Sequence, residues 1–288
     1  MISIVVPAFN EENGIKATIR DASRILIQMG TSGAEIVVVD DGSGDHTAAV
    51  AESEGAKIVR HPHNLGYGAA LKTGIIAAQN DVIAIIDADN TYPIARLPDL
   101  IQEYRKGFDM VIGARTGDHY RESIAKSALR GVLTFLVQFT TGRKVSDVNS
   151  GFRVFSKKTA LQYFDHLCDT YSFTTSLTLA YMMTRRFVTY VPVAYDARVG
   201  KSKVRMLRDS LLTLEYIVLS ATYYDPLKLF ILFSAVCVLL SFAGFAISVS
   251  TGIRGGYLLG LGGLLVALLV FSIGLLASLL KQIMDKRT

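Results

Sequence analysis

The chain has little cysteine and no grouping of histidines typical of a catalytic or metal site. Cys168 and Cys237 are its two cysteines, and Cys237 lies in a long apolar run. We therefore expect neither a disulfide framework nor a cysteine-based metal site. The five histidines form no recognisable pair of a base and its orienting residue, and we interpret each as a surface or loop residue. No internal repeat or low-complexity linker is recognisable.

Apolar residues are abundant and unevenly distributed. The mean hydropathy is +0.35, and the excess lies in residues 227–249 and 257–280. Each run exceeds the ~20 residues that cross a bilayer, which disfavours the alternative of two buried core helices. We therefore predict a first domain with interfacial helices over residues 1–226 and a membrane anchor of two transmembrane helices over residues 227–288.

Positive charge is concentrated in the predicted anchor. Residues 227–288 contain five Lys or Arg and one acidic residue. By the positive-inside rule, the basic residues that flank the spans place both chain ends in the cytoplasm. No signal peptide is recognisable at Met1, so we expect the first domain to be cytoplasmic, at the cell membrane. Small residues in the second span allow close helix contact and permit a homo-oligomer. The flanking basic residues are Lys228, Lys281, Lys286 and Arg287, and the small residues are Gly260, Gly262 and Gly263.

The first 226 residues alternate β-rich runs with helical patterns. This order predicts a mainly parallel α/β sheet, in which ligands bind outside the carboxyl ends of the strands. Three polar clusters, at 7–12, 40–43 and 87–89, lie at predicted strand ends. The expected strands are 2–6, 35–40, 57–59, 82–87 and 109–112, and the expected helices are 14–29, 45–54, 67–79 and 94–105.

Asp87 and Asp89 follow the apolar run 82–86 and would leave the strand on the same face. Two carboxylates there can hold a hard divalent cation beside phosphate oxygens, as binding of a nucleotide diphosphate requires. A polar turn after a core strand is the alternative, and the other two clusters would also fit a turn or a helix start. The glycine turn at 64–70, which lets the backbone approach a ligand, favours binding for the whole set.

Seven motifs, in this order, resemble those of the family-two glycosyltransferases, and within them the polyprenyl-phosphate glycosyltransferases that include dolichyl-phosphate mannose synthase. The resemblance covers residues 1–226 and implies a nucleotide-sugar-binding domain of the GT-A type with a Mg²⁺ or Mn²⁺ ion. Members of this family often carry Gln, which assists the metal, where this chain has Thr91. The metal coordination and the donor therefore follow less directly from the resemblance than the rest of the site. The motifs are 7–12, 40–43, 64–70, 87–89, 113–115, 150–153 and 198–203.

The resemblance also implies roles for individual residues. Asp87 and Asp89 would flank the diphosphate and its metal ion. Five residues would surround the base and the ribose: Pro7, Ala8, Phe9, Glu11 and Asp41. Gly200 and Ser202 indicate a mobile loop, which makes Arg198 and Lys203 candidates for closing over the diphosphate. Their alternative role is attraction to the membrane surface.

Two amphipathic stretches suit an acceptor with an apolar tail. Between residues 121 and 141 apolar residues recur at helical spacing, and Lys126 and Arg130 stand four apart on an adjacent face. A second stretch covers residues 205–222. We expect both stretches to form helices at the membrane interface. The alternative, for half of the surface of each helix, is ordinary core packing against the sheet. A basic, apolar face beside two membrane spans favours a lipid whose head is a phosphate.

A phosphate acceptor is already an anion and needs no general base. We therefore predict inverting, metal-dependent transfer of a hexose from a nucleotide diphosphate sugar to polyprenyl phosphate, with a UDP-sugar preferred over GDP-mannose and no nucleic acid partner. Asp89, Arg115 and Arg130 would be the catalytic residues, and Arg115, Lys126 and Arg130 would hold the attacking phosphate.

Two alternatives remain open from the sequence. A glycosyltransferase with a hydroxyl acceptor would need a carboxylate base, for which Asp147 is the best-placed candidate. A membrane scaffold without activity is the other alternative, and intact Asp87, Asp89 and Arg115 argue against it.

Overall fold

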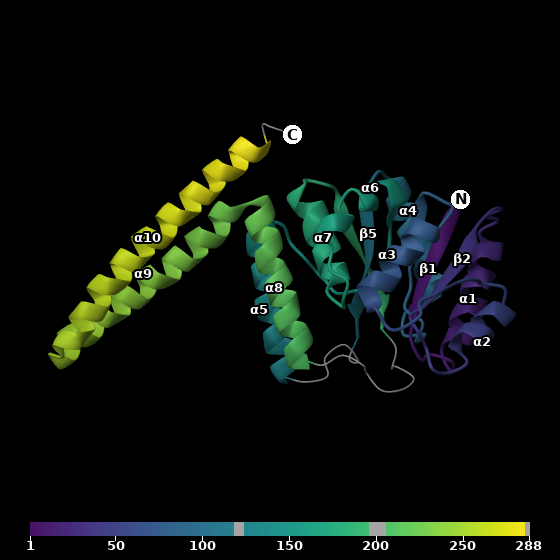
Figure 1. The fold of residues 1–288 in the computed structure, drawn as a ribbon, viewed down its shortest axis with the longest axis horizontal. Coiled ribbons are helices and arrows are strands. Elements are labelled where there is room, and N and C mark those ends of the chain that lie inside the picture. Colours follow the sequence, from purple (N-terminus) through teal and green to yellow (C-terminus); the bar gives the residue numbers. More distant parts are fainter. Residues whose placement is uncertain (118–123, 196–205, 286–288) are drawn as a thin grey trace. The chain divides into compact units, whose positions relative to one another are not determined.

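In the computed structural model, the described part of the chain contains a seven-stranded sheet in the order β3-β2-β1-β4-β6-β5-β7 (Figure 1). The structure describes residues 1–117, 124–195 and 206–285, without the side chains of 124–130, 206, 207, 209 and 285. Strand β6 is antiparallel to both of its neighbours, β4 and β5. The remaining strand pairings are parallel. The predicted mainly parallel sheet is thus confirmed. The strands are β1 (Ile2–Ala8), β2 (Glu35–Asp40), β3 (Lys57–Arg60), β4 (Val82–Ile85), β5 (Met110–Thr116), β6 (Arg153–Ser156) and β7 (Val188–Ala194).

The predicted strands and helices of the first half are present, with ends shifted by a few residues. The sequence did not predict β6, β7 or the buried helix α7 (Phe173–Met183). The other helices of this part are α1 (Ile15–Gln28), α2 (Thr47–Ser53), α3 (Tyr67–Ala77), the 3₁₀ turn η1 (Ile94–Arg96), α4 (Leu97–Arg105), α5 (Ile124–Thr141), α6 (Lys157–Leu161) and the 3₁₀ turn η3 (Phe164–His166).

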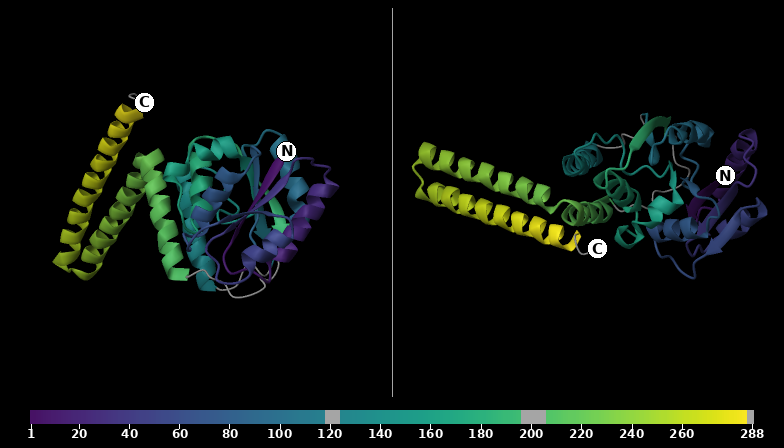
Figure 2. Two further views of the ribbon diagram at one scale, coloured as in Figure 1. Left: turned by 45° about the vertical axis from the view of Figure 1, so that its right-hand side comes forward. Right: turned by 90° about the horizontal axis from the view of Figure 1, so that it is seen from above.

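Strand β1 is buried along its whole length because helices cover both faces of the sheet (Figure 2). Ile4 and Val6 join one core cluster with residues of α1 and α4. Val5 points to the other face, where α3 packs so closely that a Cβ on Gly74 would lie 2.4 Å from Val5 Cγ1. This alternation follows from the two-residue period of a strand. It leaves the carboxyl ends of the strands as the edge where polar side chains gather.

Helix α5 carries apolar residues on two sides. Leu133 and Val137 are buried in a cluster with residues of α7 and of α8 (Met206–Tyr224). Val132 and Phe135 of the same helix are each 56% exposed. One apolar side of α5 is therefore part of the core, and the other is open to the surroundings.

The chain divides into two units, Met1–Ile217 and Val218–Thr288. In the second unit α9 (Pro226–Thr251) and α10 (Arg254–Asp285) lie side by side (Figures 1 and 2). Both helices are long and apolar enough to cross a membrane. Glycines allow the close contact: a Cβ on Gly244 would lie 3.0 Å from the carbonyl oxygen of Gly256, and a Cβ on Gly260 would lie 2.6 Å from the ring of Phe245. Gly260 therefore serves packing within the hairpin.

Candidate active site

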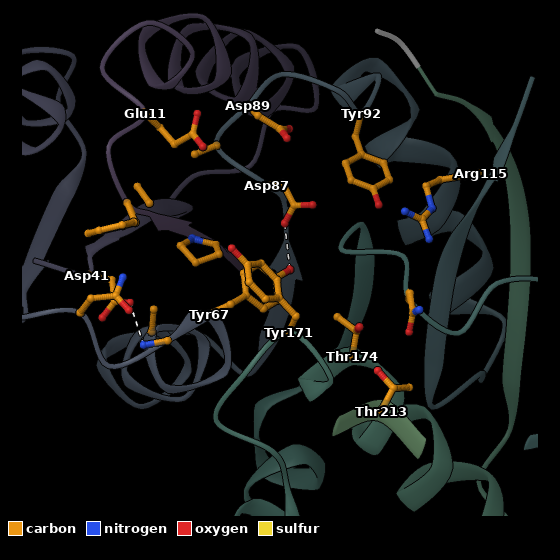
Figure 3. A pocket seen from close by; sticks show the side chains of 18 of the residues that line it. Glu11, Asp41, Tyr67, Asp87, Asp89, Tyr92, Arg115, Tyr171, Thr174 and Thr213 are labelled. Carbon is orange, nitrogen blue, oxygen red and sulfur yellow. Dashed lines mark hydrogen bonds between the residues drawn. The ribbon is translucent and has the colours of Figure 1, made fainter. Parts of the chain in front are cut away.

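A pocket of about 370 Å³ lies at the carboxyl ends of β1, β4 and β5 (Figure 3). It brings together every predicted site residue whose side chain the structure describes: Pro7, Ala8, Phe9, Glu11, Asp41, Asp87, Asp89 and Arg115. Arg198 and Lys203 lie outside the described residues. Lys126 and Arg130 belong to α5, but their side chains are not described.

The loop after β1 is fastened to the loop after β2. Asn10 Oδ1 accepts a hydrogen bond from the Gly44 amide at 2.8 Å, and Ser43 Oγ accepts one from the Asn10 amide at 2.9 Å. Thr47 Oγ1 accepts a hydrogen bond from the Glu11 amide at 2.8 Å. Asn10 has a φ of 51°, which Asn tolerates better than most residues. These bonds fix the rim that Phe9 and Glu11 contribute to the pocket.

Asp41 is 3% exposed, and its carboxylate is held from three directions. The backbone amides of Leu65 and Gly66 donate to Oδ1 and Oδ2, each at 2.9 Å. Nδ1 of His61 lies 2.7 Å from Oδ1, and Nε2 of the same ring lies 2.9 Å from Thr73 Oγ1. His61 lies in the loop after β3, which agrees with its interpretation as a surface or loop residue, but its side chain is only 8% exposed and orients a pocket carboxylate, a role that the sequence did not predict.

Asp87 and Asp89 both face the pocket, and each accepts a hydrogen bond from a hydroxyl group. The Tyr67 hydroxyl donates to Asp87 Oδ1 at 2.8 Å (Figure 3). The Thr91 hydroxyl donates to Asp89 Oδ1 at 2.7 Å, and Thr91 is fully buried. Thr91 thus orients Asp89 in this structure.

The two aspartates fit a hard divalent ion. Among the described residues no group of three or more His, Cys, Asp or Glu is arranged for a metal ion. A pair of carboxylates on a pocket wall instead suits Mg²⁺ or Mn²⁺, which take their remaining ligands from phosphate oxygens and water. Asp87 and Asp89 are the residues that would hold it.

The glycine turn at 64–70 contributes Asn64, Gly66, Tyr67 and Ala70 to the pocket lining, and it also packs against another segment of the chain. A Cβ on Gly66 would lie 2.7 Å from the Asp169 carbonyl oxygen, and a Cβ on Gly68 would lie 2.3 Å from the Cys168 carbonyl oxygen. The Ala69 amide donates to the Asp169 carbonyl at 3.0 Å. Glycine is required here because the turn packs against the backbone of another segment of the same unit.

Arg115 meets Asp147 in a buried ion pair. Its Nε and Nη2 donate to Oδ2 and Oδ1 at 2.7 and 2.9 Å, and the Asn149 amide donates to Oδ1 at 3.1 Å. Burial acts to raise the pKa of Asp147, but the Arg115 charge and the hydrogen bonds from Arg115 and Asn149 outweigh it, and the pKa is lowered. Asp147 is therefore a poor proton acceptor in this arrangement.

Sequence reasoning missed the pocket residues that follow Arg115, together with Tyr67 and Tyr92. Asn149 lines the pocket because it precedes the reversed strand β6, whose amino end lies at the same edge as the carboxyl ends of β4 and β5. The aromatic and hydroxyl side chains of the wall come from several elements. They are Tyr67, Tyr92, Tyr171, Tyr195, Thr174, Ser210 and Thr213.

The fold and the pocket define an α/β enzyme of the GT-A type. Residues 3–164 match the model of Glycosyl transferase family 2, which is more than half of the chain. The chain belongs to this family and is a glycosyltransferase.

Curated proteins and solved structures agree with this assignment. The chain is 30% identical over 278 residues to an undecaprenyl-phosphate 4-deoxy-4-formamido-L-arabinose transferase of Pseudomonas fluorescens, covering 94% of this chain and 73% of that protein. It is 28% identical over 205 residues to a dolichyl-phosphate hexose transferase of Haloferax volcanii, covering 70% and 86%. A glucosyl-3-phosphoglycerate synthase of Mycobacterium tuberculosis, solved with Mn²⁺, UDP-glucose and phosphoglyceric acid, shares the fold with a TM-score of 0.60 at 21% identity, covering 77% and 79% of the two chains.

Proposed function

We propose that this glycosyltransferase moves a hexose from a nucleotide diphosphate sugar to polyprenyl phosphate, with inversion at the anomeric carbon. The names of the curated relatives support a polyprenyl phosphate acceptor. The observation that carries the proposal is the ion pair between Arg115 and Asp147 at the pocket wall. It supplies a cation for an acceptor phosphate and occupies the carboxylate that a hydroxyl acceptor would need as a base.

The donor side of the site consists of residues that precede β5. Phe9 and Asp41 belong to the wall proposed for the nucleoside, and Asp87 and Asp89 belong to the wall proposed for the diphosphate. A Mg²⁺ or Mn²⁺ ion held by the two aspartates would neutralise charge on the departing diphosphate. The neighbour with the same fold was solved with UDP-glucose, and we place a UDP-sugar ahead of GDP-mannose.

The acceptor side would work by positioning and by charge. A phosphate monoester is an anion at neutral pH, so its oxygen attacks the anomeric carbon without loss of a proton to the protein. We assign Arg115, Lys126 and Arg130 to holding this phosphate in line with the departing diphosphate. Arg198 and Lys203 would close over the diphosphate. Asp147 would keep the Arg115 guanidinium in position for the acceptor.

The second unit would hold the enzyme in the cell membrane. We propose that α9 and α10 are transmembrane helices of a 227–288 anchor, and that residues 1–226 and both chain ends are cytoplasmic. Basic and tyrosine residues gather at one end of the hairpin, where Lys281 Nζ donates to the Tyr224 carbonyl and Lys228 pairs with Asp225. Such residues favour the interface between membrane and water, and Lys favours its cytoplasmic side. The exposed apolar side of α5, with Val132 and Phe135, would lie at the same interface.

An acceptor assay tests the proposal. Purified full-length protein is incubated with polyprenyl phosphate, Mg²⁺ or Mn²⁺, and a panel of UDP- and GDP-sugars, and the lipid product is identified by mass. We expect one hexose on the lipid phosphate. NMR of the product should show that its anomeric configuration is inverted relative to the donor. The Asp89→Asn variant serves as the inactive control. Transfer to a hydroxyl acceptor, with none to polyprenyl phosphate, would contradict the proposal.

A further inference from the structure

We propose that Tyr67 is a positioning residue that fixes the Asp87 carboxylate for the donor diphosphate and its metal ion. The inference rests on the proposed function and deepens it, because it concerns how one of the two metal-facing carboxylates is held. Tyr67 is the first residue of α3, directly after the glycine turn, and its hydroxyl donates to Asp87 Oδ1 at 2.8 Å (Figure 3).

The position of Tyr67 is set by packing on both sides of it in the sequence. Gly66 and Gly68 pack against the backbone of Cys168 and Asp169, where a side chain on either glycine would clash. Lys72, one turn further along α3, reinforces this contact through Asp169 Oδ1 at 2.6 Å and the Leu167 carbonyl at 2.7 Å. The backbone that carries Tyr67 is therefore fixed to a second segment of the pocket wall.

The same contact brings Tyr171 onto the Tyr67 ring. The two rings stack with centroids 5.6 Å apart and planes 17° apart. Offset stacking of this kind is a favourable aromatic arrangement, and it restricts the tilt of the Tyr67 ring. The hydroxyl at the end of the ring is thereby aimed at Asp87.

Asp87 is confined from another direction by a backbone. A Cβ on Gly151 would lie 2.5 Å from Asp87 Oδ2 and 2.6 Å from Oδ1, so the carboxylate rests against the bare Cα of this glycine. Gly151 is itself fixed, because its amide donates to the Tyr92 hydroxyl at 2.9 Å. Tyr67 and Gly151 together leave the carboxylate little freedom to rotate.

The test compares Tyr67→Phe, which removes the hydroxyl and keeps the stacked ring, with Tyr163→Phe. The Tyr163 hydroxyl also makes side-chain hydrogen bonds, to Thr184 Oγ1 at 2.8 Å and to Arg186, but Tyr163 does not line the pocket. Binding of UDP and of GDP to the full-length proteins is measured by calorimetry, with Mn²⁺ and with chelator. We expect Tyr67→Phe to weaken Mn²⁺-dependent binding on the order of tenfold, since the lost bond has a charged acceptor, and to leave binding in chelator unchanged. Tyr163→Phe should bind as the wild type does.

A purely structural role would lower the melting temperature and affect binding with and without Mn²⁺ alike. Gly151→Ala provides a second test, because its new methyl group would displace the same carboxylate. If Tyr67→Phe does not fold, Gly151→Ala must show the selective loss of Mn²⁺-dependent binding. Unchanged Mn²⁺-dependent binding in either folded variant overturns the inference.

The outcomes also separate this inference from the proposed function. The wild-type protein could bind nucleotide with Mn²⁺ and yet transfer no hexose to polyprenyl phosphate. This result would overturn the acceptor assignment, whereas the comparison of Tyr67→Phe with Tyr163→Phe in nucleotide binding would still test the inference. A wild-type protein whose nucleotide binding gains nothing from Mn²⁺ would overturn both.

Discussion

Arg115 and Asp147 form a bidentate ion pair in which the carboxylate side chain is 2% exposed and the guanidinium side chain is 17% exposed. The Tyr195 ring lies 5.4 Å from the guanidinium carbon. The carboxylate thus orients the guanidinium before an acceptor arrives, while the cation keeps its access to the pocket. This division of roles suits an acceptor that brings its own negative charge.

We predict that Arg115→Ala or Arg130→Ala raises the KM for polyprenyl phosphate or lowers kcat on the order of 10²-fold, because a charge-assisted contact of a few kcal/mol is lost. Donor binding should change much less. Asp147→Asn should retain the chemistry, and Arg105→Ala, an exposed arginine on α4, is the matched control. Steady-state kinetics of each variant, with kcat and the KM for polyprenyl phosphate measured separately, test this prediction. An inactive Asp147→Asn beside normal Arg115 and Arg130 variants would favour the hydroxyl-acceptor mechanism.

We also predict a pH-dependent contribution of Asp147 to stability. Because the folded-state pKa of Asp147 is lowered, its ion pair stabilises the fold above the unfolded pKa of about 4, and this stabilisation is lost as the pH falls through the folded-state pKa. The melting temperature of the wild type should therefore exceed that of Asp147→Asn at pH 7, and the difference should shrink below about pH 4. Thermal unfolding of both proteins from pH 3 to 7 measures this. A difference that grows in acid would contradict the assignment.

The metal site gives a third prediction. Activity should require Mg²⁺ or Mn²⁺, and Asp89→Asn should nearly abolish turnover without unfolding the protein, since one of two oxygen donors becomes a neutral amide. Turnover is measured after chelation and after return of each ion, with the melting temperature as the check on folding. Full activity of Asp89→Asn in chelator would remove the metal from the mechanism.

His61 gives a fourth prediction, which concerns the donor alone. His61→Ala removes the ring that contacts Asp41 and should raise the KM for the nucleotide sugar by about tenfold, with a smaller change in kcat at saturation. His63→Ala, at an exposed position two residues away, is the control and should match the wild type. An equal loss in both variants, or a loss confined to kcat, would show that His61 does not act through donor binding.

A fifth prediction concerns the anchor. Removing residues 227–288 should leave a folded domain that binds donor but turns over long-chain polyprenyl phosphate poorly, because α9 and α10 no longer hold it at the membrane. Turnover is compared in membranes for the truncated and full-length proteins, and a short-chain, water-soluble acceptor serves as the control. Unchanged turnover of the long-chain lipid by the truncated protein would show that the spans do not help to deliver it.

The donor side of the pocket was predictable from sequence because it follows a local rule. Asp41, Asp87 and the loop from Pro7 to Glu11 each follow a β-rich run, and parallel strands bring their carboxyl ends to one edge. Strand position alone was therefore enough to place them together.

The rest depended on long-range packing that no local pattern encodes. The short run 153–156 gives no sign that β6 inserts in reverse between β4 and β5, so Asn149 was not expected in the pocket. The partners of Tyr67 and His61 are likewise distant in sequence. Tyr67 stacks on Tyr171. His61 follows β3, and it contacts Asp41, which follows the adjacent strand β2.

The position of α4 in the chain determines how the enzyme can be recombined. Pocket residues from 7 to 92 precede α4 and include the donor wall, whereas those from 115 to 213 follow it and include the proposed acceptor wall, and α4 itself contributes none. A crossover within α4 between two such enzymes would exchange one wall as a continuous block and leave the other intact. Chimeras joined there should inherit nucleotide preference from the first parent and lipid preference from the second.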